Sequence, residues 1–203
     1  MRKIAKLLVI FFLLLITLFG VDVIRDRALL SNDLIRLHVV ADSDSEEDQA
    51  VKLRVRDAVA DYLQTHMANI TDQAEAKEFL QQHIPELTAT ANQVLEEAGF
   101  TERAEITLTR EAFPKREYDT FSLPAGVYES LRIRIGQAQG QNWWCVVFPS
   151  LCLQAVGEDF TDTAAGAGFD EPLTGALEGQ ETYQVRFFIL DCLGWLQNFF
   201  HQL

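Results

Sequence analysis

The sequence predicts a single α+β domain, in which helices pack on a mostly antiparallel sheet in the order β-α-α-β-β-β-α, preceded by an N-terminal signal or anchor helix. Two observations predict this class. Stretches with the period of a strand and stretches with the period of a helix follow one another, and no repeat or strong domain boundary divides the chain. The 203 residues are enough for one hydrophobic core and too few for two comfortable ones. With 48% apolar and 23% charged residues, the composition is typical of a globular domain.

The first half of the domain is predicted to be a strand followed by helices. Residues 34–41 (LIRLHVVA) are apolar and β-branched, which favours a strand. Residues 46–67 have apolar positions at helical spacing, and Ser45 is placed to cap the start of that helix. A second helical stretch covers 72–98, and Pro85 is expected to begin a new helix within it because proline suits a first turn.

The second half is predicted to be mainly β, closed by a helix. Strands are expected at 104–110, 127–135 and 142–148. The GQAQGQ segment is expected to join the last two strands as a hairpin-like connection, and a flexible loop is expected near 157–180. Residues 183–200 are predicted to form an apolar helix, whose core-facing positions are Val185, Phe188, Ile189, Cys192, Leu196 and Phe199.

The N-terminus resembles an export signal. Three basic residues among the first six precede the uncharged run LLVIFFLLLITLF at 7–19. This run is shorter than the roughly 20 residues of a membrane span, and no A-x-A cleavage site follows it. Residues 1–27 are therefore expected to be a removed export signal or a retained anchor, and residues 28–203 an extracytoplasmic domain. Membrane contact is expected only through residues 4–24, if the leader is uncleaved.

The charge balance excludes several kinds of partner. Acidic residues outnumber basic ones 30 to 17, which gives a net charge of −13. A nucleic-acid binder needs clustered Lys and Arg, so no nucleic-acid partner is expected. Electrostatic adsorption to an anionic lipid surface is disfavoured for the same reason.

Three cysteines fit an exported protein. Cys145 and Cys152 flank VVFPSL, in which Pro149 turns the chain, and a disulfide between them is a candidate because exported chains lie where disulfides form. The alternative is two buried thiols that behave as small apolar side chains. Cys192 lies in the predicted C-terminal helix and is expected to be a core thiol.

No catalytic, cofactor or metal site is predicted. The acidic run at 42–48 fails as an EF-hand loop, because Glu47 and Leu53 stand where a glycine and a carboxylate are required. The chain has neither a G-x-S-x-G nucleophile elbow nor a phosphate-binding glycine motif. His38 with nearby acids such as Asp44 leaves an exported envelope hydrolase as an alternative.

Adjacent tryptophans and alternating arginines suggest a binding surface. Trp143 and Trp144 lie next to each other on a predicted strand, so they point to opposite faces. One can enter the core, and the other needs a helix, a strand or a partner to cover it. Arg132 and Arg134 alternate along another strand, and exposed aromatic and Arg side chains are typical of binding hot spots. Two buried tryptophans in a central strand are the alternative.

Two long blocks carry a family resemblance. IRLHVVADSDSEEDQAVKLRVRDAV (35–59) and LPAGVYESLRIRIGQAQGQNWWCVVFPSLC (123–152) contain rare combinations such as NWWC. With the leader and VRFFILDCLGW (185–195), they resemble the stage II sporulation protein R family. That family usually has Asn where this chain has Asp42, and often a second Pro where it has Ser150.

The resemblance implies an intercellular signal that is not itself an enzyme. Such proteins are made in the forespore and exported into the space between the forespore and mother-cell membranes. There they activate a membrane-embedded aspartic protease that processes pro-sigma-E. The expected contact residues are Arg36, His38, Asp42, Asp44, Arg132, Arg134, Trp143 and Trp144. An anchored structural protein of the septal envelope is a further alternative, which requires residues 4–24 to stay in the membrane.

Overall fold

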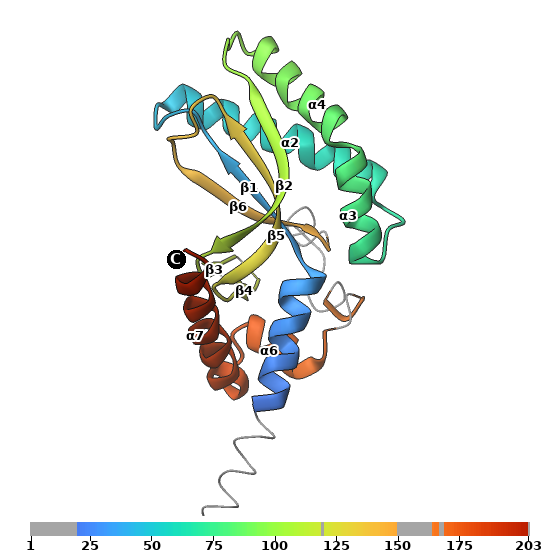
Figure 1. Ribbon diagram of the computed structural model, residues 1–203, viewed down its shortest axis with the longest axis vertical. Helices are drawn as coiled ribbons and strands as arrows, with labels where there is room; N and C mark the ends of the chain where they lie inside the picture. The colour runs from blue at the N-terminus through green and yellow to red at the C-terminus, as the bar shows by residue number, and fades with distance from the viewer. Residues whose placement is uncertain (1–19, 119, 150–163, 167–168, 203) are drawn as a thin grey trace, which may run out of the picture.

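The computed structural model describes residues 20–118, 120–149, 164–166 and 169–202 (Figure 1). Its strands are β1 (Ile35–Val40), β2 (Ala104–Phe113), β3 (Arg116–Glu117), β4 (Ser122–Leu123), β5 (Gly126–Ile135) and β6 (Asn142–Phe148). Its named helices are α2 (Glu46–His66), α3 (Gln73–Gln82), α4 (Ile84–Glu97), α6 (Glu171–Leu177), η1 (Glu181–Tyr183) and α7 (Gln184–His201). The predicted α+β class is confirmed.

The main sheet is mixed. Among the described residues, its strand order is β2-β5-β1-β6, and β3 pairs with β4 in a separate small ribbon. β1 runs parallel to β5, whereas β1 with β6 and β2 with β5 are antiparallel. The hairpin predicted between β5 and β6 is wrong. Both strands pair with β1, which lies between them, so residues 136–141 cross the end of β1 instead of turning directly back.

The first face of the sheet is covered by α2, α3 and α4 (Figure 1). Alternate residues of β1 and β5 enter this core, together with apolar side chains of the three helices. The Ser45 side chain accepts a hydrogen bond from the Asp48 amide at the start of α2, and Pro85 lies in the first turn of α4. Both local predictions are therefore confirmed.

A second core lies on the opposite face of the same sheet, although the chain length suggested only one. Sheet residues such as Phe113, Tyr128 and Val146 pack there against apolar side chains of residues 20–33, α6 and α7. The small β3–β4 ribbon adds Phe121 and Leu123. This second layer covers one end of the face and leaves the polar strand residues at the other end partly exposed.

Residues that precede the predicted boundary at residue 27 are part of the packed structure. Residues 20–33 are helical, and Val23, Asp26 and Leu30 are buried in the second core. The boundary predicted at residue 27 therefore falls inside a packed helix. The rest of the predicted leader, residues 1–19, lies outside the described residues. Within the described part of the chain, no helix has the length and apolarity needed to cross a membrane.

The predicted loop near 157–180 is partly helical. Residues 157–163 lie outside the described residues, but α6 forms at 171–177, with Asp170 accepting a hydrogen bond from the Leu173 amide at its start. Leu173 and Leu177 are buried in the second core, which explains why this segment is ordered as a helix despite its many small residues.

The C-terminal helix α7 forms as predicted, but most of the side chains that were expected to face the core point toward solvent. Val185, Phe188, Leu196 and Phe199 were expected to be core residues, yet they are exposed, and Cys192 is exposed too. The residues that α7 buries are Leu190 and Gly194.

Candidate functional site

Three neighbouring strands bring residues of the two sequence blocks together on the second face of the sheet. His38 of β1 lies opposite Arg132 of β5 on one side and opposite Trp144 of β6 on the other. Leu37 and Leu131 belong to the first core, so the next residue along each strand points to the opposite face. We call His38, Glu111, Arg132, Asn142 and Trp144 the His38 cluster.

The imidazole of His38 is held from three directions. Its Nδ1 lies 3.1 Å from each carboxylate oxygen of Glu111, and its Nε2 lies 2.7 Å from Oδ1 of Asn142. One ring face stacks on Trp144. We assign the Nδ1 hydrogen to the bond with Glu111. In a neutral ring, Nε2 then accepts a hydrogen bond from the side-chain amide of Asn142. In a protonated ring, Nε2 donates a hydrogen bond to the Asn142 side-chain oxygen. His38 is 4% exposed, and both of its nitrogens are occupied.

Glu111 is the acidic member of the cluster that the sequence did not indicate. Burial raises its pKa, but the His38 hydrogen bond, the neighbouring Ser130 and the charges of His38 and Arg132 outweigh this, so the pKa lies below its ordinary value. The Nε atom of Arg132 is 3.8 Å from Oε2 of Glu111. The predicted strand at 104–110 ended three residues before β2 does, and continuing its alternation would have placed Glu111 on this face.

Arg36 is a fully buried guanidinium that has no carboxylate partner among the described residues. Its Nη2 donates to the Tyr118 hydroxyl at 2.6 Å, and its Nε lies 3.5 Å from the Cys145 carbonyl oxygen. Its central carbon is 4.3 Å from the ring centroid of Phe113 and 5.2 Å from that of Tyr128. Aromatic faces thus take the place of an ion pair. Arg36 lies beneath the surface in this structure and supports the cluster from below.

Arg132 and Arg134 are the surface-facing cations of this face. Their side chains are half-exposed, and each faces a glutamate on β2, Glu111 for Arg132 and Glu105 for Arg134. The Arg134 pair, with Nη1 3.6 Å from the carboxylate of Glu105, is open to solvent, so it contributes little to stability. These guanidinium groups are available to an approaching partner.

Asp42 and Asp44 lie beyond the end of β1 and outside the cluster. Oδ1 of Asp42 accepts a hydrogen bond from the amide of Gln137, which fixes the connection that crosses β1. At Gly140, the backbone of this connection lies close to the backbone of Ser43, because an added Cβ would be 2.1 Å from the Ser43 carbonyl oxygen. Asp42 therefore has a structural role, and Asp44 is an exposed residue of the same turn.

The two tryptophans point to opposite faces, as their adjacency predicts. Trp144 packs in the His38 cluster and makes an edge contact with Phe113 at 4.7 Å between ring centroids. Trp143 lies on the face covered by α2, where the guanidinium carbon of Arg56 is 4.4 Å from its ring centroid. Only Trp144 shares a surface with Arg132 and Arg134.

The cysteines divide into a bonded and a free group. Cys145 is disulfide-bonded, whereas Cys152 lies outside the described residues, so the Cys145–Cys152 pairing stays a prediction. Cys192 carries a free, exposed thiol on α7, which corrects the expectation of a core thiol.

The described residues offer little for metal or acid–base chemistry. They contain no group of three or more His, Cys, Asp and Glu side chains arranged to hold a metal ion. His38, the residue on which a hydrolase would depend, has neither a free nitrogen nor open access to solvent. A general base must reach the proton that it abstracts, and this ring is enclosed.

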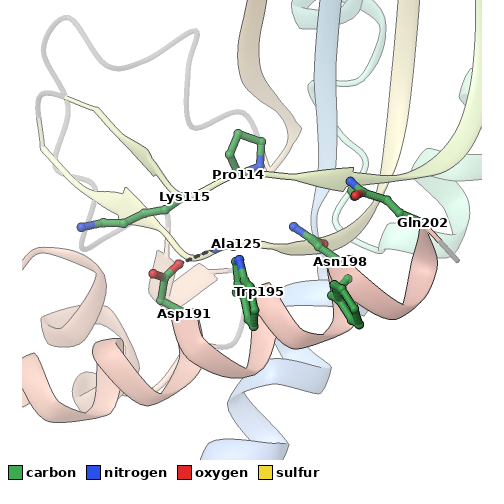
Figure 2. Close-up of a pocket in the computed structure, with 9 residues that line it drawn as sticks. Pro114, Lys115, Ala125, Asp191, Trp195, Asn198 and Gln202 are labelled. Carbon is green, nitrogen blue, oxygen red and sulfur yellow. Dashed lines mark hydrogen bonds between the residues drawn. The ribbon is translucent and has the colours of Figure 1, made fainter.

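A separate hollow of about 380 Å³ lies between α7 and the end of β2 (Figure 2). Pro114, Lys115, Asp191, Trp195 and Phe199 are among the residues that line it. Asp191 is already engaged there, because its Oδ1 accepts a hydrogen bond from the Ala125 amide at 2.8 Å. This hollow borders the exposed side of α7 and is distinct from the His38 cluster.

Comparison with known proteins places the cluster within a family. The family described as Stage II sporulation protein R matches residues 31–158, which include β1, β2, β5, β6 and every member of the His38 cluster. The chain is similar to the Stage II sporulation protein R of Bacillus subtilis (strain 168), with 38% identity over 118 residues. This alignment covers 58% of the chain and 53% of the relative, so the chain spans about half the length of the curated relative that it matches. No solved structure matches the chain.

The matched residues are those that form the central sheet, the helices of the first core and the His38 cluster, whereas α7 lies outside them. The long sequence blocks, the confirmed fold class and the family match agree. This chain belongs to the stage II sporulation protein R family.

Proposed function

We propose that this protein is an exported intercellular signal of endospore formation. In this proposal it is made in the forespore, crosses into the space between the forespore and mother-cell membranes, and activates the membrane-embedded aspartic protease that processes pro-sigma-E. The family match and the export-like leader support the proposal. The partner is the one that the family resemblance implies.

The observation that carries the proposal is the construction of the His38 cluster. Buried Arg36 and His38, with half-buried Glu111, fix the positions of a partly exposed tryptophan and a partly exposed arginine on this sheet face. Rigid aromatic and Arg side chains are the usual anchors of protein–protein interfaces. We infer that Trp144, Arg132 and Arg134 contact the protease, while the buried residues hold them in place.

Activation requires a difference in affinity. A ligand that binds both states of the protease equally shifts nothing, so this protein must bind the active state more tightly. A shift from almost fully inactive to almost fully active requires a preference of about 10⁴-fold. The outward-facing part of the protease is the expected docking region, and the active state is expected to be dimeric.

Reconstitution in cells tests the proposal. The chain with its leader is expressed together with the protease and pro-sigma-E, without other sporulation proteins, and processing is followed on gels. Processing that depends on this chain and on the protease supports the activator role. Absence of processing, with the chain shown to be exported and folded, contradicts it.

Paired arginine variants sharpen the result. Arg134→Glu reverses an exposed charge on the proposed surface, and Arg103→Glu reverses a comparable charge elsewhere, since each arginine faces a glutamate at a similar distance. We expect Arg134→Glu to reduce processing and Arg103→Glu to leave it unchanged, at equal protein levels. Equal processing by both variants removes Arg134 from the contact surface. Folded Trp144→Ala and Arg36→Ala proteins that trigger processing fully would likewise remove those residues from the mechanism.

The same assay distinguishes the hydrolase alternative. A ligand acts near stoichiometrically and only with the protease, whereas an enzyme turns over a substrate without it. Activity that disappears in His38→Gln, in the absence of the protease, would favour the hydrolase.

A further inference from the structure

Three polar side chains of α7 bond to the rest of the domain. Arg186 bonds to the fully buried carboxylate of Asp26 at 2.5 Å, and Asp191 accepts from the backbone amide of Ala125 at 2.8 Å. The side-chain amide of Asn198 donates to a backbone carbonyl at the end of β2 at 2.7 Å. The polar side of this helix is thus used to fasten it to the domain.

The outward side of α7 is apolar. At 3.6 residues per turn, the exposed side chains fall on one arc of the helix, and they are Val185, Phe188, Trp195, Leu196, Phe199 and Phe200. Each is 44% to 69% exposed, and the rings of Trp195 and Phe199 stack with centroids 6.1 Å apart. No charged residue lies within this outward arc. A surface of this kind normally marks a contact with a membrane or a partner.

The helix at residues 20–33 packs beside α7 and follows the predicted leader in the sequence. Arg27 of that helix donates from Nη1 to the Leu190 carbonyl of α7 at 3.2 Å, so the two helices are fastened to each other. Val21 and Ile24 are exposed on it at 64% and 66%. In the sequence, the apolar run at 7–19 directly precedes these helical residues.

We propose that α7 lies on a lipid bilayer, with its outward arc at the boundary between headgroups and acyl chains. A helix with an uncharged Phe-, Trp- and Leu-rich side and a separate polar side is typical of interfacial binding. In the sequence, the predicted leader directly precedes the helix that is fastened to α7, so a membrane-directed segment joins the domain at a helix that contacts α7. The sequence predicted membrane contact only through residues 4–24, and α7 adds a contact that does not depend on leader retention or on the proposed signalling role.

The absence of charged side chains on the outward arc of α7 predicts which lipids it should bind. With no cation on the arc and a net charge of −13 on the chain, anionic headgroups supply no attraction. Contact should therefore occur on neutral phosphatidylcholine, and it should not weaken when salt screens charges.

Cys192 provides a local probe, because its thiol is free and exposed on the outward side of α7. The full chain is labelled there, without reductant, with a polarity-sensitive fluorophore and is reconstituted into phosphatidylcholine vesicles that contain doxyl-quencher lipids. We expect a blue-shifted emission and strong quenching. The control carries Cys192→Ser with Ala50→Cys, which moves the label to an exposed position on α2, and it should report water even when the leader holds the chain on the vesicle.

Variants then test the apolar arc. Phe188→Ser with Phe199→Ser should return the Cys192 emission toward its aqueous value, and the docking equilibrium should fall about tenfold or more per phenylalanine. Leu53→Ser, which removes an exposed apolar side chain from α2, should have no effect.

Two outcomes overturn the proposal. A Cys192 emission that stays aqueous on vesicles but shifts at high protein concentration without lipid, with dimers in light scattering, assigns the arc to a second copy. An emission that shifts only when the membrane protease is added assigns it to a protein partner.

Discussion

The ring of His38 stacks on the ring of Trp144, with centroids 3.8 Å apart and an angle of 17° between the planes. The two residues lie directly opposite each other on β1 and β6. Because His38 is enclosed and Trp144 is half-exposed, the pair joins the buried polar centre of the sheet to its surface. Mutations on this face are therefore expected to lower the free energy of unfolding more than mutations of equal size on the other face.

Trp144→Ala should destabilise the protein more than Trp143→Ala. Trp144 loses its stack on His38 and its contact with Phe113, and we expect a loss of about 2–3 kcal/mol in the free energy of unfolding. Trp143 is 37% exposed and packs on Arg56, so its removal should cost about 1 kcal/mol. Urea denaturation measures both values, and equal losses would contradict the assignment of the two faces.

Glu111 should contribute stability that depends on pH. Its pKa in the folded protein lies below its ordinary value, so the contribution is complete above the ordinary glutamate range and is lost as the pH falls through the lowered pKa. We expect Glu111→Gln to cost about 1–2 kcal/mol at neutral pH and progressively less as the pH falls below the ordinary glutamate range. Urea titrations at several pH values test this difference. Glu105→Gln, an exposed carboxylate on the same strand, is the control and should show little effect.

Arg36→Lys should be worse tolerated than Arg36→Met. A lysine keeps the charge but loses the planar contact with Phe113 and the bond to the Tyr118 hydroxyl, so a loss of about 2 kcal/mol or more is expected. Methionine removes a buried cation and keeps much of the volume, so it should remain within about 1 kcal/mol of the native protein. Thermal unfolding ranks the two. If methionine is the more harmful change, the charge itself is required.

Gly194→Ala should loosen α7. A Cβ at this position would lie 1.6 Å from the carbonyl oxygen of Ala125, so the helix cannot keep its distance from the sheet. We expect a loss of about 2–3 kcal/mol, of the size found for overpacked positions. Gly166→Ala is the matched control, because nothing lies within 4 Å of its added Cβ. Hydrogen exchange of α7 amides shows whether the helix itself is released, and unchanged protection would contradict this packing.

Local signals in the sequence predicted local structure well. Ser45 and Pro85 fixed the starts of α2 and α4, because caps and first-turn prolines act within one turn of helix. Pairing between distant strands was not predictable in the same way. The GQAQGQ segment has the composition of a hairpin turn, but β1 lies between the strands that it joins.

The sequence predicted most of the residues of the candidate site, but it did not predict which of them are exposed and which are buried. Trp144, Arg132 and Arg134 do face the surface, whereas Arg36 and His38 proved buried and Glu111 was missed, because burial depends on the helices that cover each end of the sheet. The prediction of which side of α7 faces the core was wrong for a related reason. Apolar periodicity identifies one side of a helix as apolar, but it does not say whether protein or something else covers that side.

The position of β1 at the centre of the sheet has a consequence for how the chain reaches its native state. β1 is complete by residue 40, but both of its partners lie within residues 126–148. During synthesis the sheet therefore cannot close until most of the chain has left the ribosome, and contacts between such distant segments form slowly. The export that we propose is compatible with this order, because a chain whose sheet has not yet closed can pass through an export channel as an extended polypeptide and fold on the far side.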